Sequence, residues 1–223
     1  LDLRKAEPYS SYEKFQFDMC VGKDGIGELR SEILSSIDNG TLLLTFLGHA
    51  GSQTWELMLI SEDLFDLQND GRLPFIASMS CHTARYANPD QDTFGETFLR
   101  LPERGAVGFW GTSGWGFVFQ DGVLLDKMYA ALAQDSVRTL GMLTTLAKIG
   151  LWQQWGSGLT NVSIVDQYSL LGDPALRLAL PQTPELVMRP FRIMAGTGCT
   201  LRGDAIEAIE AALETWSPDY PAR

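Results

Sequence analysis

Three short apolar runs constrain the fold of this chain most strongly, and they cover residues 41–47, 74–80 and 105–111. The first run is apolar on both of its faces, which is typical of a central strand in a parallel sheet. The segments between the runs are long enough to hold crossover helices. The sequence therefore predicts an α/β fold with right-handed crossovers and helices on both faces of a mostly parallel sheet.

The remaining elements follow from helical spacing and from turn residues. Apolar side chains between positions 29 and 37 recur on one helix face, and Asn39-Gly40 ends that helix. The predicted helices cover residues 27–37, 61–68, 93–101, 121–134 and 138–153, and a turn at 169–174 leads to a final strand at 175–180.

The composition changes after Pro181, and this change marks the expected domain boundary. We expect residues 1–181 to form one domain. Residues 182–203 carry two prolines and loose patterning, which is typical of a linker. An amphipathic helix is predicted within the last part of the chain, so that 182–223 is a linker followed by a helix.

Charge and cysteine content exclude several classes of function. A net charge of −11 argues against a nucleic acid or an anionic membrane as partner. No apolar stretch approaches the ~20 residues that a membrane span needs. The three cysteines, Cys20, Cys81 and Cys199, are too few for a disulfide framework, and two histidines cannot build a His-rich zinc site.

The two residues that carry chemistry each follow a predicted strand. His49 comes directly after the strand at 41–47 and its glycine, and Cys81 comes directly after the strand at 74–80. Taken singly, such a cysteine is more often a small buried residue. Ligand and active sites in open α/β sheets form outside the carboxyl ends of the strands, however, and a thiol with an imidazole suffices for acyl transfer. The pair therefore predicts a cysteine peptidase.

Several motifs in one order resemble the gingipain family of cysteine peptidases, over roughly residues 40–180. In chain order they are Gly48-His49-Ala50-Gly51-Ser52 with Trp55, Cys81 after the next strand, the helix 94–100, the strand segment 105–113, and the turn Leu171-Gly172-Asp173-Pro174. The resemblance implies a caspase-like three-layer sandwich. Because the match starts near residue 40, we expect a chain that lacks the N-terminal strands of the family domain.

The resemblance also implies roles for individual residues. His49 is expected to act as general base and then general acid, and Cys81 as nucleophile. The backbone N–H groups of Ala50 and Cys81 are expected to form the oxyanion hole. Alanine stands where the family usually has glycine, so the hole depends on local dihedral angles that suit a residue with a Cβ. The family's orienting carboxylate lies upstream, in the portion that we expect to be absent.

Other site residues are weaker candidates. Trp115 and Ser113 follow the third strand, where related enzymes shape the pocket for the residue before the cleaved bond, and His82 is a candidate contact for substrate. Asp121 stands near the expected site, and we interpret it as a helix cap rather than as a specificity charge.

Cofactors, partners and compartment rest on the resemblance alone. The Cys/His mechanism requires no cofactor and we expect no metal at the site. Calcium is compatible with the family, although no loop has regular ligand spacing. The expected partners are a protein or peptide substrate and an N-terminal chain or segment of the same precursor. The expected location is secreted or in a bacterial cell envelope.

Two alternatives to a general endopeptidase remain open. A catalytically degenerate homologue would bind a peptide or partner without cleaving it, and Ala50 with the absent carboxylate motivates this reading. A dedicated maturation protease of a secretion pathway would cleave one class of protein substrate.

Overall fold

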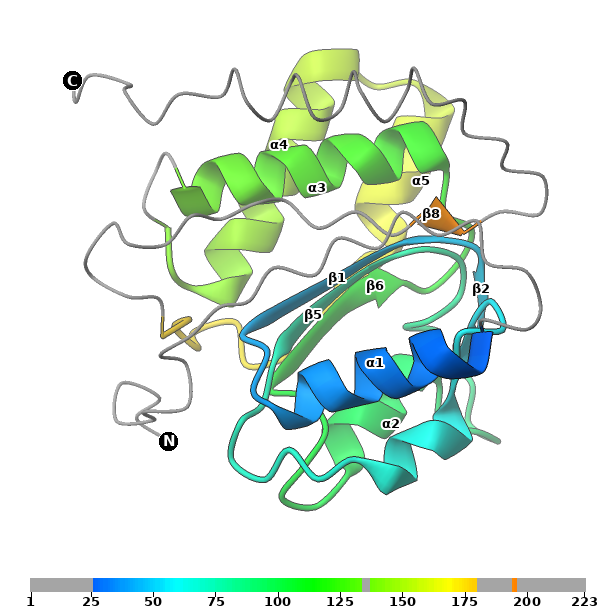
Figure 1. The fold of residues 1–223 in the computed structure, drawn as a ribbon. Helices are drawn as coiled ribbons and strands as arrows, with labels where there is room; N and C mark the ends of the chain where they lie inside the picture. Colours follow the sequence, from blue (N-terminus) through cyan, green and yellow to red (C-terminus); the bar gives the residue numbers. More distant parts are fainter. Residues whose placement is uncertain (1–25, 134–136, 180–193, 196–223) are drawn as a thin grey trace, which may run out of the picture.

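The computed structural model describes residues 26–133, 137–179 and 194–195. A five-stranded sheet runs through the middle of the molecule in the order β7-β6-β5-β1-β8 (Figure 1). Its strands are β1 (Leu43–Gly48), β5 (Phe75–Met79), β6 (Gly108–Thr112), β7 (Tyr168–Gly172) and β8 (Met194–Ala195). The pairs β1–β5, β5–β6 and β1–β8 are parallel, and β6–β7 is antiparallel.

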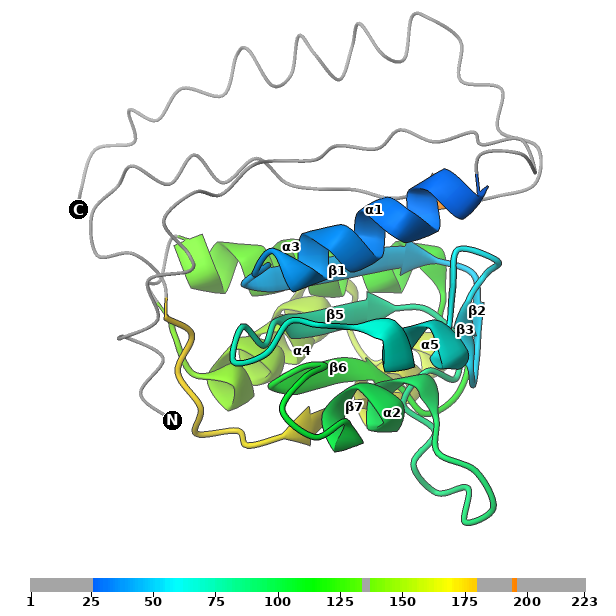
Figure 2. The ribbon, with the colours of Figure 1, turned by 60° about the horizontal axis from the view of Figure 1, so that its bottom comes forward.

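Helices cover both faces of this sheet and complete three layers (Figures 1 and 2). One face carries α1 (Ile26–Asp38), α2 (Phe94–Arg100) and the 3₁₀ helix η4 (Ser61–Asp66). The opposite face carries α3 (Val118–Ala133), α4 (Leu140–Trp155) and α5 (Leu159–Gln167). The predicted α/β class and mostly parallel sheet are therefore confirmed.

Alternation along the central strands explains why the sheet has two cores. Ile76 of β5 packs on the α1 and α2 side, whereas Phe75 and Ala77 pack on the α3 and α4 side. In β6, Phe109 and Trp110 divide between the two cores in the same way. Successive side chains of a strand point to opposite faces, so a strand that is apolar throughout must be covered on both.

The last predicted strand and turn were placed wrongly. The final strand of the domain is β7 at 168–172, and it includes most of the segment that we interpreted as a turn. Residues 175–179 hold no strand beyond an isolated bridge between Thr139 and Arg177. β7 lies at the sheet edge and is only partly buried, so it lacks the continuous apolar pattern of the central strands. Helix α5, which the sequence analysis did not predict, precedes it directly.

Smaller differences concern element boundaries. The helix predicted at 61–68 is the shorter η4, and α3 begins at Val118 rather than at residue 121. Within 182–223, the two residues of β8 pair with Leu47 and Gly48 of β1. The rest of that segment, with its predicted linker and helix, lies outside the described residues, as do Cys20 and Cys199. Among the described residues, no helix has the length and apolar character needed to cross a membrane.

Candidate active site

The structure places His49 and Cys81 just beyond two neighbouring parallel strands. The register of β1 and β5 pairs Leu47 with Met79. His49 and Cys81 each stand two residues further along, so they leave the same edge of the sheet at the same level. His49 is exposed and Cys81 is half-buried. This arrangement is what the carboxyl ends of adjacent parallel strands provide for a site.

A small antiparallel sheet follows His49 and fixes the direction in which the chain leaves β1. It consists of β2 (Ala50–Gly51), β3 (Thr54–Trp55) and β4 (Leu59–Ile60). The buried Trp55 ring stacks on Phe46 with ring centroids 4.7 Å apart, and its Nε1–H donates to Ser78 Oγ at 2.9 Å. Trp55 therefore ties the segment after His49 to both β1 and β5.

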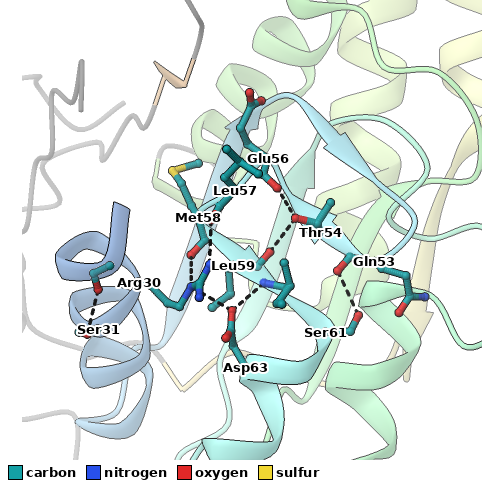
Figure 3. Close-up of polar contacts among 12 residues, drawn as sticks. Arg30, Ser31, Gln53, Thr54, Glu56, Leu57, Met58, Leu59, Ser61 and Asp63 are labelled. Atoms are coloured by element: carbon teal, nitrogen blue, oxygen red, sulfur yellow. Dashed lines mark hydrogen bonds and ion pairs between the residues drawn. The ribbon is translucent and has the colours of Figure 1, made fainter. Parts of the chain in front are cut away.

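Arg30 of α1 holds the outer turn of this small sheet (Figure 3). Its guanidinium donates to the carbonyl oxygens of Met58 and Leu57 at 3.2 and 3.0 Å, and pairs with the Asp63 carboxylate at 3.1 Å. Asp63 also accepts the backbone N–H of Ile60 at 2.9 Å. These contacts anchor the turn to α1 and η4.

Cys81 lies against the loop that follows β6. The Gly116 N–H donates to Cys81 Sγ at 3.4 Å, and the thiol in turn reaches the Gly116 carbonyl oxygen at 3.8 Å. The backbone N–H of His82 donates to the Gly114 carbonyl oxygen at 2.7 Å. Gly114 and Gly116 therefore hold this loop against Cys81 and His82, through the Cys81 sulfur and the His82 backbone.

His82 takes a conformation that few residues other than glycine adopt. Its φ is 61°, in the left-handed region, directly after Cys81. The imidazole contacts the edge of the Trp115 ring, with ring centroids 4.8 Å apart, and among the described residues its buried Nδ1 has no hydrogen-bond partner. Trp115 itself is 65% exposed. A large, exposed aromatic ring next to the residue after Cys81 is available to contact a ligand.

The other predicted site residues lie on the same edge but have local roles in the fold. The Ser113 hydroxyl donates to the Gln167 carbonyl oxygen at 3.1 Å, and the Ser113 N–H donates to the same oxygen at 2.9 Å. Ala50 lies in β2 opposite Trp55. Ala50 is not one of the described residues that have a positive φ, so its Cβ introduces no left-handed strain.

Asp121 and Tyr168 form a buried pair near Cys81 that the sequence analysis did not predict. Asp121 lies inside the first turn of α3 rather than at the residue before it, and its carboxylate accepts a hydrogen bond from the Phe117 backbone just before the helix, as a capping side chain does. Its carboxylate accepts a hydrogen bond from the Tyr168 hydroxyl at 2.8 Å. No spacing rule could have joined these residues, because they lie 47 positions apart on α3 and β7.

Burial controls the ionisation of this pair. It raises the pKa of the Asp121 carboxyl from 3.8 to about 6, against the opposing effect of hydrogen bonds with Tyr168 and with the Phe117 backbone. Burial likewise raises the pKa of the Tyr168 hydroxyl well above its usual range, and negative charge on Asp121 and on Cys81 adds to the rise. A hydrogen bond with the Ser80 backbone acts in the opposite direction. Tyr168 is therefore close enough to Cys81 for their charges to interact.

Metal ligands are not grouped in this part of the molecule. Within 26–133, 137–179 and 194–195, no set of three or more His, Cys, Asp or Glu side chains is placed to hold a metal ion. Calcium also binds through carbonyl oxygens, so calcium stays a prediction.

Comparison with known proteins now identifies the family. The family model for peptidase family C25 matches residues 3–179, which is well over half of the chain. This chain belongs to peptidase family C25. A search of curated protein sequences finds no significant match.

Solved structures confirm the predicted fold. The crystal structure of the Arg-specific cysteine proteinase gingipain R has a TM-score of 0.63 and 19% identity over 67% of this chain. The complex of the pro- and mature domains of RgpB from Porphyromonas gingivalis has the same values, and a structure described only as a protease has a TM-score of 0.61 and 20% identity. The matches span 36–38% of the lengths of those chains. At a sequence identity of 19–20%, the similarity to these structures is a similarity of fold.

Proposed function

We propose that this member of family C25 is a cysteine endopeptidase in which Cys81 is the nucleophile and His49 the general base. The observation that carries the proposal is the common register of the two residues at the carboxyl edge of β1 and β5. The family assignment supports it independently.

The proposed reaction has two steps. The Cys81 thiol passes its proton to His49, and the sulfur attacks the carbonyl carbon of the scissile peptide bond. The C–N bond then breaks, and His49 gives the proton to the leaving amine. In the second step a water molecule, deprotonated by His49, cleaves the thioester, releases the carboxylate product and regenerates the thiol.

The surrounding residues would stabilise and select the substrate. The N–H groups of Ala50 and Cys81 are the proposed donors to the oxyanion, and the loss of one such donor costs about 2.7–4 kcal/mol of barrier in comparable enzymes. The exposed Trp115 ring and His82, which it contacts, form one wall for the residue before the cleaved bond. Ser113 shapes the same loop through its hydrogen bonds to Gln167.

Partners and compartment are proposed at the level of the family. One of the similar structures is a complex between pro- and mature domains, and by analogy we propose an N-terminal chain or segment of the same precursor as a partner here. A secreted or cell-envelope location and a calcium requirement are proposed on the same basis. The substrate is a protein or peptide.

The proposal is tested by incubating the full chain with a peptide library and identifying cleaved bonds by mass spectrometry. We expect cleavage by the wild type and by Cys199→Ser, and no cleavage by Cys81→Ser or His49→Gln. Retained cleavage in Cys81→Ser would overturn the assignment of the nucleophile. If the wild type binds peptides but leaves them uncleaved, the degenerate homologue is favoured instead. If it cleaves only one protein, a dedicated maturation protease is favoured.

A further inference from the structure

A buried polar pair lies behind Cys81 that the proposed reaction does not use. Asp121 is 3% exposed and Tyr168 is 1% exposed, and the Tyr168 hydroxyl donates to Asp121 Oδ1 at 2.8 Å. The two residues come from α3 and β7, which pack on the same core. Burial of ionisable groups lowers stability unless hydrogen bonds or opposite charges compensate for the lost solvation. The presence of such a pair at this position therefore suggests that it has a role.

The pair touches both segments that meet at the sulfur. On one side, Tyr168 forms a hydrogen bond with the Ser80 backbone and interacts electrostatically with Cys81. On the other side, the Asp121 carboxylate lies against the loop: a Cβ built on Gly116 would be 2.6 Å from Asp121 Oδ2 and 3.0 Å from the Ser80 carbonyl carbon. Tyr168 therefore contacts the segment that carries Cys81, and Asp121 lies against the loop whose amide contacts the sulfur.

We propose that Asp121 and Tyr168 are positioning residues that hold the Gly116 amide on the Cys81 sulfur. The inference rests on the proposed function, in which that sulfur must become a thiolate. A thiolate accepts a hydrogen bond more strongly than a thiol does, so a fixed N–H donor stabilises the reactive form.

The loop needs such support because glycine leaves its backbone free. Gly114 and Gly116 flank Trp115, and glycine loses more conformational entropy on ordering than any other residue. Tyr168 is itself held from its far side, because Lys148 Nζ of α4 donates to its carbonyl oxygen at 2.6 Å. A chain of contacts therefore connects Lys148 of α4 to Tyr168 of β7, then to Asp121 of α3, and finally to the loop.

A direct effect of the Asp121 charge on the Cys81 thiol would be opposite to the effect of positioning. An ionised Asp121 carboxylate close to the sulfur disfavours a second negative charge, so removal of that carboxylate would lower the pKa of the thiol. Positioning predicts a rise, because the amide donor is released. The sign of the change separates the two effects.

The experiment measures the rate of alkylation of Cys81 by iodoacetamide as a function of pH, read by mass spectrometry on the peptide that contains Cys81. We expect Tyr168→Phe and Asp121→Ala each to raise the apparent pKa of alkylation by about 1. Asp121→Asn keeps an acceptor for the Tyr168 hydroxyl and is expected to restore a value close to the wild type. On a cleaved peptide, the first two variants should lower kcat about tenfold with little change in KM.

Matched controls separate positioning from general damage. Tyr129→Phe removes another tyrosine hydroxyl that is hydrogen-bonded, to Thr45 at 3.2 Å, and Asp126→Asn changes an exposed carboxylate on the same helix. Both should leave the alkylation profile unchanged. If Asp121→Ala fails to fold, the alkylation profile of Tyr168→Phe is sufficient to test the inference.

Two results would overturn the inference. If the pH profile of Cys81 alkylation is unchanged in Tyr168→Phe, the pair has only a structural role. If the apparent pKa of alkylation is lowered in Asp121→Ala, the carboxylate acts through its charge. Alkylation requires no peptide cleavage, so failure of the proposed peptidase activity would be seen separately from failure of the positioning role.

Discussion

Ionisation of Asp121 should make the folded protein less stable as the pH rises. Burial raises the pKa of this carboxyl from 3.8 to about 6. Between these values the folded state holds a proton that the unfolded chain has released, so the free energy of unfolding falls with increasing pH. The favourable contribution is complete below pH 3.8 and is lost as the pH passes through about 6. At 1.36 kcal/mol per pKa unit, the full loss is about 3 kcal/mol.

The substitution Asp121→Asn removes this titration and keeps an acceptor for the Tyr168 hydroxyl. Other titrating groups affect both proteins equally, so the relevant quantity is the difference in unfolding free energy between variant and wild type. We expect that difference to move in favour of the variant by up to about 3 kcal/mol between pH 4 and pH 7.5.

Urea unfolding at several pH values measures this difference directly. A change of about 3 kcal/mol shifts the unfolding midpoint by about 1 M or more, because m-values in urea are typically about 1–3 kcal/mol/M. Asp126→Asn, an exposed carboxylate on the same helix, is the control and should show no pH-dependent difference. A flat difference for Asp121→Asn, or one that favours the wild type at high pH, would refute the argument from burial.

Three further substitutions test the packing around the site. Cys81→Ala should abolish peptide cleavage while the unfolding free energy changes by no more than about 1–2 kcal/mol, which activity and urea assays measure together; retained cleavage contradicts the assignment. Gly116→Ala places a Cβ 2.6 Å from Asp121 Oδ2, so the rate of Cys81 alkylation at neutral pH should fall and stability should drop by about 1–3 kcal/mol; wild-type rates would speak against the loop contact. Gly105→Ala puts a Cβ 2.0 Å from the Phe98 carbonyl oxygen at a φ of +93°, and thermal unfolding should show a loss above about 2 kcal/mol; a neutral result would refute this tight packing.

The central strands could be predicted because their physical requirements are local. A strand that is buried on both faces must be apolar along its length, and residues 43–48, 75–79 and 108–112 lie within or next to the apolar runs. Since parallel strands share a carboxyl edge, the sequence also placed His49 and Cys81 on one edge, and the register of β1 and β5 agrees with that placement.

The edge strand and the polar pair could not be predicted because their causes are not local. β7 is antiparallel and partly exposed, and Gly172-Asp173-Pro174 at its end gives the whole segment the pattern of a turn. Asp121 and Tyr168 meet only because α3 and β7 pack on one core. Neither residue differs in its sequence context from an ordinary helix or strand residue.

The left-handed conformation of His82 has the same kind of origin. A histidine at a strand end carries no sequence signal for a φ of 61°. The backbone contact of His82 with Gly114 and the ring contact with Trp115 hold it there. Such strain of about 1–3 kcal/mol persists where the surrounding structure over-determines it, often at functional sites.

The central claim is that Cys81 and His49 act together on a peptide carbonyl. The most direct measurement is the second-order rate constant for labelling of Cys81 by a peptidyl chloromethyl ketone, compared with the constant for iodoacetamide, in the wild type and in His49→Ala. The account predicts selective labelling of Cys81 in the wild type, and a loss of at least about tenfold in His49→Ala. Equal rates in the two proteins, or labelling of Cys20 and Cys199 as fast as of Cys81, would contradict it.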